Sequence, residues 1–186
     1  MSENSSNGGE ILPVLKDGNL KKWYAVYTTP RAEKLVAERL VEAEVEVFLP
    51  LQKTYRVWSD RKKLVMKPLL TSYVFVHVTE KQFSKVFMTN GVVRFVSFEG
   101  RPASIPREQI DTLRLLINSN EKIEVSSAIF AEGDRVEVMI GSLVGLKGEL
   151  VRIGRANRVI VRIDRLDQNL ILRIPKTFLR RIRNEA

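Results

Sequence analysis

The chain has 186 residues, 44% of them hydrophobic, and carries a net charge of +9 from 31 basic and 22 acidic residues. This length suits one ordinary domain or two small ones. The absence of cysteine excludes disulfides and thiolate metal sites, and the only histidine is His77. No apolar run is long enough to cross a bilayer and no signal-peptide layout is found, so we expect a cytoplasmic monomer without metal, cofactor or membrane contact.

Residues 1–20 are polar and are expected to form a mobile tail, and short strands and helices interleave over 21–118. In the first strand, alternation places Trp23, Ala25 and Tyr27 on one face. The other expected elements are a helix at 29–44 with Thr29 as N-cap and Pro30 at its first position, strands at 45–49 and 92–96, a hairpin with arms 54–58 and 63–66, and helices at 81–88 and 105–118. This order predicts an α+β sandwich of the ferredoxin-like type around an antiparallel sheet.

The stretch 72–78 is nearly all apolar, which is typical of a central strand covered on both faces. Pro68 cannot donate to a β-ladder and should lie just outside the sheet. Leu69 and Leu70 then lie at the mouth of a buried strand. They are either core residues or part of an exposed apolar patch, and such a patch on a domain usually marks the docking site of a partner.

The character of the chain changes after residue 118. Residues 119–129 are polar, break both periodicities and are interpreted as a linker. Residues 130–186 lack a helical stripe and contain short strands separated by glycine and asparagine, which predicts a small β-barrel with strands at 136–138, 147–153, 158–163 and 170–174. Alternation over 158–163 places the arginines on the outer face of the barrel, where we expect them to be solvated.

A glycine pattern opens this second domain. Gly133 and Asp134 form a turn into a strand, Gly141 permits a positive φ, and Gly148 allows a close backbone approach. A phosphate-binding loop is disfavoured because no helix follows and no Lys-Ser/Thr pair closes the loop. The pattern is similar to the KOW motif of SH3-like barrels in NusG-type transcription factors and some ribosomal proteins.

The resemblance extends upstream and covers about residues 22–183. It is carried by the segments 23–27 (WYAVY), 29–34 (TPRAEK), 48–50 (FLP), 58–63 (WSDRKK), 68–76 (PLLTSYVFV), 91–96 (GVVRFV) and 102–106 (PASIP). Their order resembles the N-terminal (NGN) domain of the NusG family, and specialised paralogues (RfaH, and UpxY-like regulators of capsule operons) more than general NusG. Thr71 stands where many members have proline. The implied layout is a tail at 1–20, an NGN domain at 21–118, a linker at 119–129 and a KOW barrel at 130–186.

The resemblance implies a transcription elongation or antitermination factor that binds the clamp helices of RNA polymerase and suppresses pausing or termination at particular operons, such as surface-polysaccharide operons. The implied polymerase-binding residues are Trp23, Tyr27, Leu69, Leu70 and Tyr73. The implied nucleic-acid-binding residues, for the non-template DNA strand, are Arg31, Lys34, Arg39, Arg61, Lys62, Thr89 and Asn90. For the barrel, the resemblance implies ribosomal protein S10 or Rho as partner, and the clean strand alternation favours a stable barrel.

Two alternatives stay open. The basic residues of the first helix fit an ordinary solvated helix face equally well. The arginine-rich barrel fits a KOW-domain RNA-binding or ribosome-associated protein, since a basic domain commonly meets a polyanion. An enzyme is disfavoured: His77 alternates with valines inside a strand, and no carboxylate pair or nucleophile elbow suggests a catalytic site.

Overall fold

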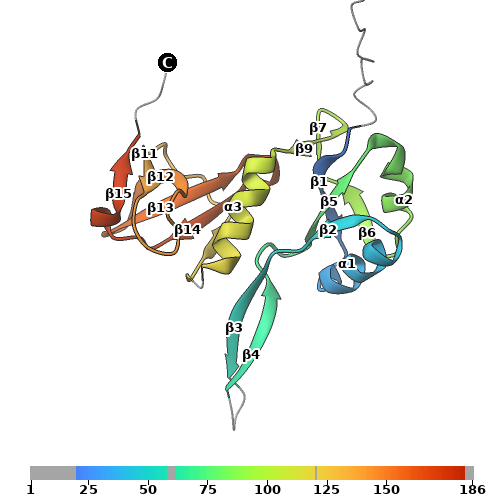
Figure 1. Ribbon diagram of the computed structural model, residues 1–186, viewed down its shortest axis with the longest axis horizontal. Coiled ribbons are helices and arrows are strands. Elements are labelled where there is room, and N and C mark those ends of the chain that lie inside the picture. Colours follow the sequence, from blue (N-terminus) through green and yellow to red (C-terminus); the bar gives the residue numbers. More distant parts are fainter. Residues whose placement is uncertain (1–19, 58–61, 120, 183–186) are drawn as a thin grey trace, which may run out of the picture.

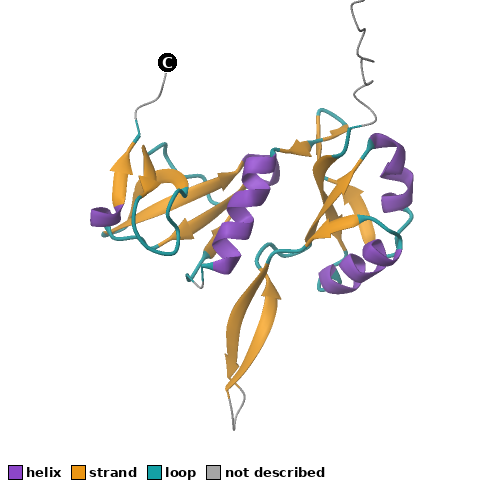
Figure 2. Cartoon of the chain, in the orientation of Figure 1, coloured by secondary structure: helices purple, strands orange, loops and turns teal. Residues whose placement is uncertain are grey.

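The computed structural model describes residues 20–57, 62–119 and 121–182 (Figure 1). The expected tail therefore lies outside the described residues except for Leu20, and so does the nucleic-acid candidate Arg61. The described chain forms an N-terminal α+β domain and a C-terminal β-domain, with the third helix between them (Figures 1 and 2).

The N-terminal domain is built on an antiparallel sheet of order β2-β5-β1-β6, with a short strand β9 also paired to β1. Its strands are β1 (Lys22–Thr28), β2 (Glu46–Phe48), β5 (Tyr73–Val78), β6 (Val92–Phe95) and β9 (Ser104–Ile105). The apolar strand β5 lies between β2 and β1, as its composition predicted. Another small pair, β7 (Ser97–Phe98) and β8 (Arg101–Pro102), follows β6.

Helices cover the two faces of this sheet unequally. One face packs on α1 (Glu33–Glu42) and α2 (Phe83–Phe87), which follows the 3₁₀ turn η2 (Glu80–Gln82), and it contains Tyr24 and Val26 in its core. The other face, with Trp23 and Ala25, packs on α3 (Arg107–Asn118). The alternation predicted for β1 is thereby confirmed.

A two-stranded hairpin projects from the domain (Figure 1). It consists of β3 (Leu51–Val57) and β4 (Lys62–Pro68), paired only with each other. Pro68 is the last residue of β4, opposite Leu51, and so lies outside the central sheet, as predicted. Because β4 has no second neighbour, the missing N–H of proline costs no ladder bond on its open side.

The C-terminal domain is a six-stranded antiparallel sheet of order β10-β14-β13-β12-β11-β15. The strands are β10 (Glu124–Ser126), β11 (Asp134–Val138), β12 (Lys147–Ile153), β13 (Ala156–Ile163), β14 (Gln168–Leu172) and β15 (Leu179–Arg181), with 3₁₀ turns η3 (Asp164–Leu166) and η4 (Lys176–Phe178). Strand β10 lies inside the segment expected to be a linker and pairs with β14. The segment thus contributes an edge strand to the barrel sheet.

Both longer helices begin later than predicted. Arg31 adopts φ 65°, a left-handed conformation that cannot continue a helix, so Pro30 belongs to a turn and α1 begins at Glu33. Pro106 is the N-cap of α3, which begins at Arg107. The buried residues of α1 are Glu33, Val36 and Leu40, whereas Leu35 is 47% exposed.

Candidate functional site

The central strand β5 begins at a cleft of about 900 Å³. The cleft lies between the hairpin, the segment 67–73, the segment 121–127 and Gln168 of the barrel. Leu69, Leu70 and Tyr73 contribute to its lining, yet they are only 6%, 1% and 7% exposed. The interpretation of the two leucines as an exposed patch is therefore wrong for this conformation; they are core residues at the edge of an open concavity.

The cover over these residues comes from the C-terminal half of the chain. A single hydrophobic core contains Leu70 and Tyr73 of the sheet domain, Leu113 of α3, and Leu166 and Leu170 of the barrel. Trp23, also predicted to contact a partner, is buried in the same core, whereas Tyr27 is only partly buried. Four of the five predicted docking side chains are thus covered, and the chain has closed over its own apolar face.

Polar and aromatic contacts join the two domains around this core. Gln109 Nε2 of α3 donates to Asp164 Oδ2 of the barrel at 3.4 Å. The Arg165 guanidinium lies 5.0 Å from the centre of the Phe98 ring. Gln52 Nε2 of the hairpin donates to the Glu121 carbonyl at 3.2 Å. These contacts are few and partly exposed, so burial of the shared core dominates the closure.

A tyrosine pair forms the rim of the docking face. The hydroxyl oxygens of Tyr27 and Tyr73 are 2.6 Å apart, and the Arg94 guanidinium lies 4.2 Å from the centre of the Tyr27 ring. Burial, followed by the hydrogen bond with Tyr27, raises the pKa of Tyr73 far above its usual range. Tyr73 therefore stays neutral, and its hydroxyl is an anchor for a hydrogen bond beside an apolar surface.

A buried carboxylate shapes the turn that enters β5. Ser72 has φ 63°, and its N–H donates to Glu33 Oε1 at 2.7 Å; Glu33 is only 5% exposed. The bond offsets the cost of burying the carboxylate and holds Leu70 and Tyr73 on either side of a fixed turn. The sequence analysis missed Glu33, and its one signal was an acidic residue at the start of the first helix.

The predicted nucleic-acid residues are only partly brought together. Arg39 Nη1 of α1 donates to the Asn90 carbonyl at 2.8 Å, and Thr89 Oγ1 donates to the Lys85 carbonyl at 3.2 Å, so Arg39, Thr89 and Asn90 form one surface. Arg31 and Lys34 are exposed. Lys62 is the first residue of β4, and its side chain is not among the described ones.

The exposed surface beside this turn also contains large apolar side chains that the sequence analysis did not single out: Phe87, Met88 and Val93, which are 58%, 83% and 50% exposed. Gly91 makes the turn possible, because it has φ 96° and a Cβ there would lie 2.6 Å from Val36 Cγ2. The sequence contained a signal for this surface, because the large apolar residues Phe87 and Met88 directly precede Thr89 and Asn90.

The barrel glycines play the backbone roles predicted for them. Gly141 has φ 93°, and a Cβ on Gly148 would lie 2.7 Å from the Ile160 carbonyl oxygen. A Cβ on Gly133 would be only 2.4 Å from the Leu150 carbonyl oxygen. Asp134 begins β11 and accepts a hydrogen bond from Arg181 at 2.7 Å. The glycines thus permit one turn and two close backbone approaches, and Asp134 links β11 to β15.

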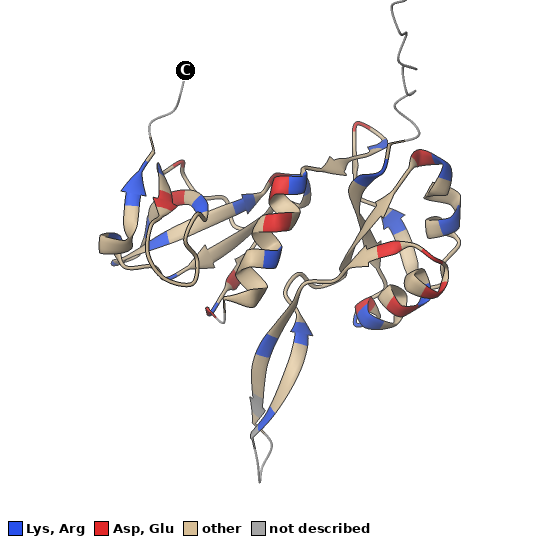
Figure 3. Ribbon diagram, viewed as in Figure 1, with Lys and Arg blue, Asp and Glu red and all other residues tan. Residues whose placement is uncertain are grey.

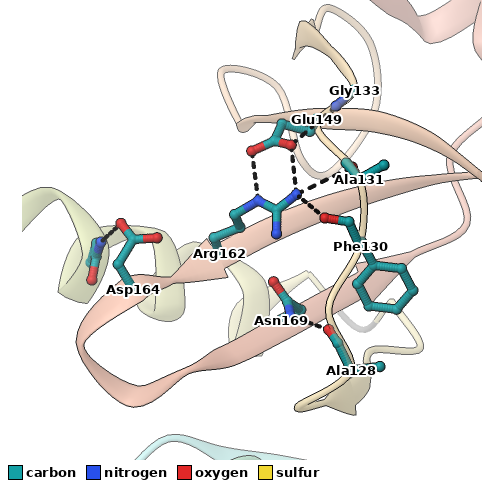
Figure 4. Close-up of polar contacts among 9 residues, drawn as sticks. Ala128, Phe130, Ala131, Gly133, Glu149, Arg162, Asp164 and Asn169 are labelled. Atoms are coloured by element: carbon teal, nitrogen blue, oxygen red, sulfur yellow. Dashed lines mark hydrogen bonds and ion pairs between the residues drawn. The ribbon is translucent and has the colours of Figure 1, made fainter.

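Arg162 was expected to be solvated, but its guanidinium links the segment between β10 and β11 to the barrel sheet (Figure 4). It donates to both carboxylate oxygens of Glu149, at 2.8 and 2.9 Å, and to the carbonyl of Phe130 at 3.2 Å. The bonds from Arg162 hold the pKa of Glu149 below its usual range. Asn169 Nδ2 donates to the Ala128 carbonyl at 3.0 Å, so side chains of the barrel bond the irregular segment between β10 and β11 at two points.

His77 has a structural setting. Its Nδ1 lies 2.7 Å from Glu46 Oε2, and its ring stacks on Trp23 with 4.8 Å between centres. Among the described residues, no group of three or more His, Asp or Glu side chains could hold a metal ion. No helix in the described part of the chain combines the length and apolar character needed to cross a membrane.

Comparisons with known proteins agree with this architecture. The family model described as "Transcription termination factor nusG" matches residues 21–114. The chain is 25% identical over 166 residues to the transcription termination/antitermination protein NusG of Rickettsia prowazekii, with 83% of this chain and 86% of that protein covered. It is 25% identical over 138 residues to NusG of Chlamydia trachomatis, with 68% and 75% covered.

Among solved structures, the chain resembles one titled "Domain interaction in Thermotoga maritima NusG". The TM-score is 0.55 at 22% identity, and the match covers 89% of this chain and 99% of the other. At this identity the likeness shows the fold alone.

Proposed function

Because the chain belongs to the NusG family of transcription termination/antitermination factors, which are not enzymes, we propose that it binds the clamp helices of RNA polymerase and suppresses pausing or termination. We further propose that it is a specialised member acting at particular operons, such as surface-polysaccharide operons. The proposed docking residues are Trp23, Tyr27, Leu69, Leu70 and Tyr73.

The observation that supports this proposal is an apolar face with aromatic side chains that is covered by a second sheet later in the chain. A pair of amphipathic helices needs an apolar surface with aromatic anchors, and Leu70, Tyr73 and Trp23 supply both. In the closed conformation these side chains are buried, so docking requires the barrel to move away. Polymerase therefore has to bind the open conformation more tightly than the closed one, by enough to offset the loss of the shared core.

Capture of the full chain by an isolated clamp-helix fragment of polymerase tests the proposal. Leu70→Asp is expected to abolish capture, because it places a charge in the docking face. Val41→Asp is a matched control, since Val41 is 60% exposed on α1. Circular dichroism of both variants verifies folding, and full capture by folded Leu70→Asp protein would refute the interface.

For nucleic acid, we propose that the surface formed by Arg39, Thr89 and Asn90, together with Lys34 of α1 and Arg31 in the turn before it, contacts the displaced non-template DNA strand. Arg61 and Lys62 at the hairpin end are proposed as a second contact, and Figure 3 shows further basic residues along both hairpin arms. Phosphate contacts of this kind are salt-dependent. The double variant Arg31→Ala/Lys34→Ala should crosslink less to non-template DNA in stalled complexes, and its crosslinking should depend less on salt. Unchanged crosslinking would mean that these residues do not contact DNA and that the basic face of α1 is only solvated.

For the barrel, we propose ribosomal protein S10 or Rho as partner. The loop between β11 and β12 presents Met139, Ile140 and Val144, which are 42%, 53% and 55% exposed. A cluster of this kind suits a protein partner better than a polyanion. Ile140→Asp should abolish binding to whichever protein is captured. Ribosome co-sedimentation that is insensitive to Ile140→Asp but lost on removing barrel arginines would favour a ribosome-associated RNA-binding protein instead.

A further inference from the structure

A second pocket, of about 380 Å³, opens at the opposite end of β1 and β5 from the cleft. A row of cross-strand neighbours forms one wall: Glu46 lies opposite His77, His77 opposite Trp23, and Trp23 opposite Ile105. Arg107 and Arg114 of α3, with the N-cap Pro106, contribute the rest of the lining together with Lys21, Lys22 and Ser104. The pocket thus lies where the edge of the sheet meets the start of the helix, outside the cleft, and none of the proposed docking residues except Trp23 lines it.

The pocket is strongly basic. The cations that line it are Lys21, Lys22, Arg107 and Arg114. One lining carboxylate, Glu46, is bonded to His77, and Asp111 outside the lining pairs with Arg114 at 3.0 Å and with Arg107 at 3.7 Å. The lining therefore contains four cationic side chains and one carboxylate. Like charges gathered around a concavity focus their field on it and attract an anion.

The donors around the pocket are also arranged for an oxyanion. The Arg114 guanidinium lies 5.4 Å from the centre of the Trp23 ring and 5.3 Å from that of Phe48, so stacking orients it. Ser104 adds an exposed hydroxyl. The flat, stacked rings of Trp23 and His77 close the base of the pocket. A cationic rim with hydroxyl and guanidinium donors is complementary to phosphate oxygens and repels metal ions.

We propose that this pocket binds a phosphate group, carried either by a nucleic-acid strand or by a free nucleotide. Its volume lies in the range of small-ligand sites, at roughly 300–1,000 Å³. Arginine at two lining positions permits two-pronged bonding to phosphate, and the two lysines add point charges at the rim. This phosphate site is separate from the proposed polymerase interface, and phosphate binding does not depend on docking to the clamp helices.

Fluorescence of Trp23 provides a direct readout. The chain has two tryptophans, so Trp58→Phe leaves Trp23, which lines the pocket, as the only emitter. The full-length protein is titrated separately with inorganic pyrophosphate, ATP and the oligonucleotide dT8. A saturable change in Trp23 emission is expected. Arg107→Glu should weaken binding by at least about tenfold, because it reverses a charge at the rim.

Arg155→Glu is the matched control. It makes the same change of net charge at an exposed turn of the barrel that does not line this pocket, and it should change affinity by less than about twofold at moderate salt. Ser104→Ala is a milder second variant and should also weaken binding. Arg107 is 80% exposed, so its replacement leaves the core intact; capture by the clamp-helix fragment, measured in parallel, should be unchanged.

The outcomes separate the sources of the phosphate. Tightest binding of dT8, with pyrophosphate as a weak competitor, assigns the site to a strand. Tight binding of ATP that dT8 does not displace assigns it to a nucleotide. The proposal is overturned if no probe gives a saturable change, or if Arg107→Glu and Arg155→Glu weaken binding equally, since diffuse attraction would then explain it.

Discussion

The two faces of the N-terminal sheet are both buried, but they are buried by different means. One face packs on α1 and α2, which come from the same domain and enclose Tyr24, Val26 and Leu40. The other face packs on α3 and shares its core with the barrel, a separate sheet later in the chain. A face covered by its own domain is exposed only by unfolding, whereas one covered by a second domain can be exposed by rigid-body movement. The residues proposed for docking, although buried in this conformation, can therefore become accessible without unfolding of the sheet domain.

Leu40→Ala tests the face covered by its own helices, and it should have the largest effect. Leu40 is fully buried at the contact between α1 and the sheet. Loss of its side chain should lower the free energy of unfolding by about 2–5 kcal/mol. Urea denaturation followed by circular dichroism measures this loss. A loss as small as that of an exposed position such as Leu35 would contradict the assignment of this face as permanent core.

Leu166→Ala tests the face covered by the barrel. Leu166 lies in η3 at 4% exposure and belongs to the shared core. We expect the contact between the domains to weaken by about 2–3 kcal/mol, with both domains still folded. Small-angle X-ray scattering should show a larger radius of gyration, and clamp-helix capture should increase. An unchanged radius of gyration together with cooperative unfolding of the whole chain would mean that the face covered by the barrel is exposed only by unfolding, like the face covered by α1 and α2.

Glu149→Gln tests whether the barrel includes the segment that follows β10. The change removes the charge partner of Arg162 and should lower the stability of the barrel by about 1–3 kcal/mol. The pKa of Glu149 is lowered in the folded protein from its ordinary value of 4.5. The stabilisation by the wild-type carboxylate is therefore complete above that value and is lost as the pH falls through the folded pKa.

The measurement is the difference in unfolding free energy between wild type and Glu149→Gln, determined at several pH values. It should be largest near neutral pH and should shrink below pH 4.5. Hydrogen exchange should become faster at the amide of Gly133, which donates to Glu149. A pH-independent difference would show that the ion pair does not secure this segment.

Arg165→Ala should have the smallest effect. Its guanidinium contacts the Phe98 ring across the domain boundary at 5.0 Å. A partly exposed cation–π contact contributes about 0.5–1 kcal/mol, so the closed conformation should lose only a few-fold in population. Relaxation-dispersion NMR can detect this shift, and Arg173→Ala, whose ion pair with Glu124 lies within the barrel sheet, is the control. Equal effects of the two substitutions would show that the Arg165 side chain does not stabilise the closed conformation.

Several parts of the molecule could be predicted from residues alone. The two faces of β1, the central position of β5 and the backbone roles of Gly141 and Gly148 all follow from short-range rules. The helix starts were less predictable. Arg31 is left-handed, and Glu33, the first residue of α1, is bonded to Ser72, which lies 39 positions later, so no local pattern encodes that contact.

The site was only half predictable for the same reason. The five docking candidates could be identified by resemblance, and the apolar character of Leu69, Leu70 and Tyr73 supports them. Their burial depends on which surface the barrel covers, and that contact joins residues about a hundred positions apart. Ser119–Ser127 looked like a linker because its composition is polar, but partners in β14 give β10 its strand conformation.

The sequence by itself indicated a sheet domain followed by a β-domain, most of their longer strands and the family, because periodicity and turn residues act over a few positions. The tertiary structure alone decided that α3 and the barrel close over one face of the sheet, and that basic residues from β1 and α3 meet around a pocket. Such features arise from packing between distant segments, whose favourable surfaces are visible in the sequence only as separate apolar or charged residues.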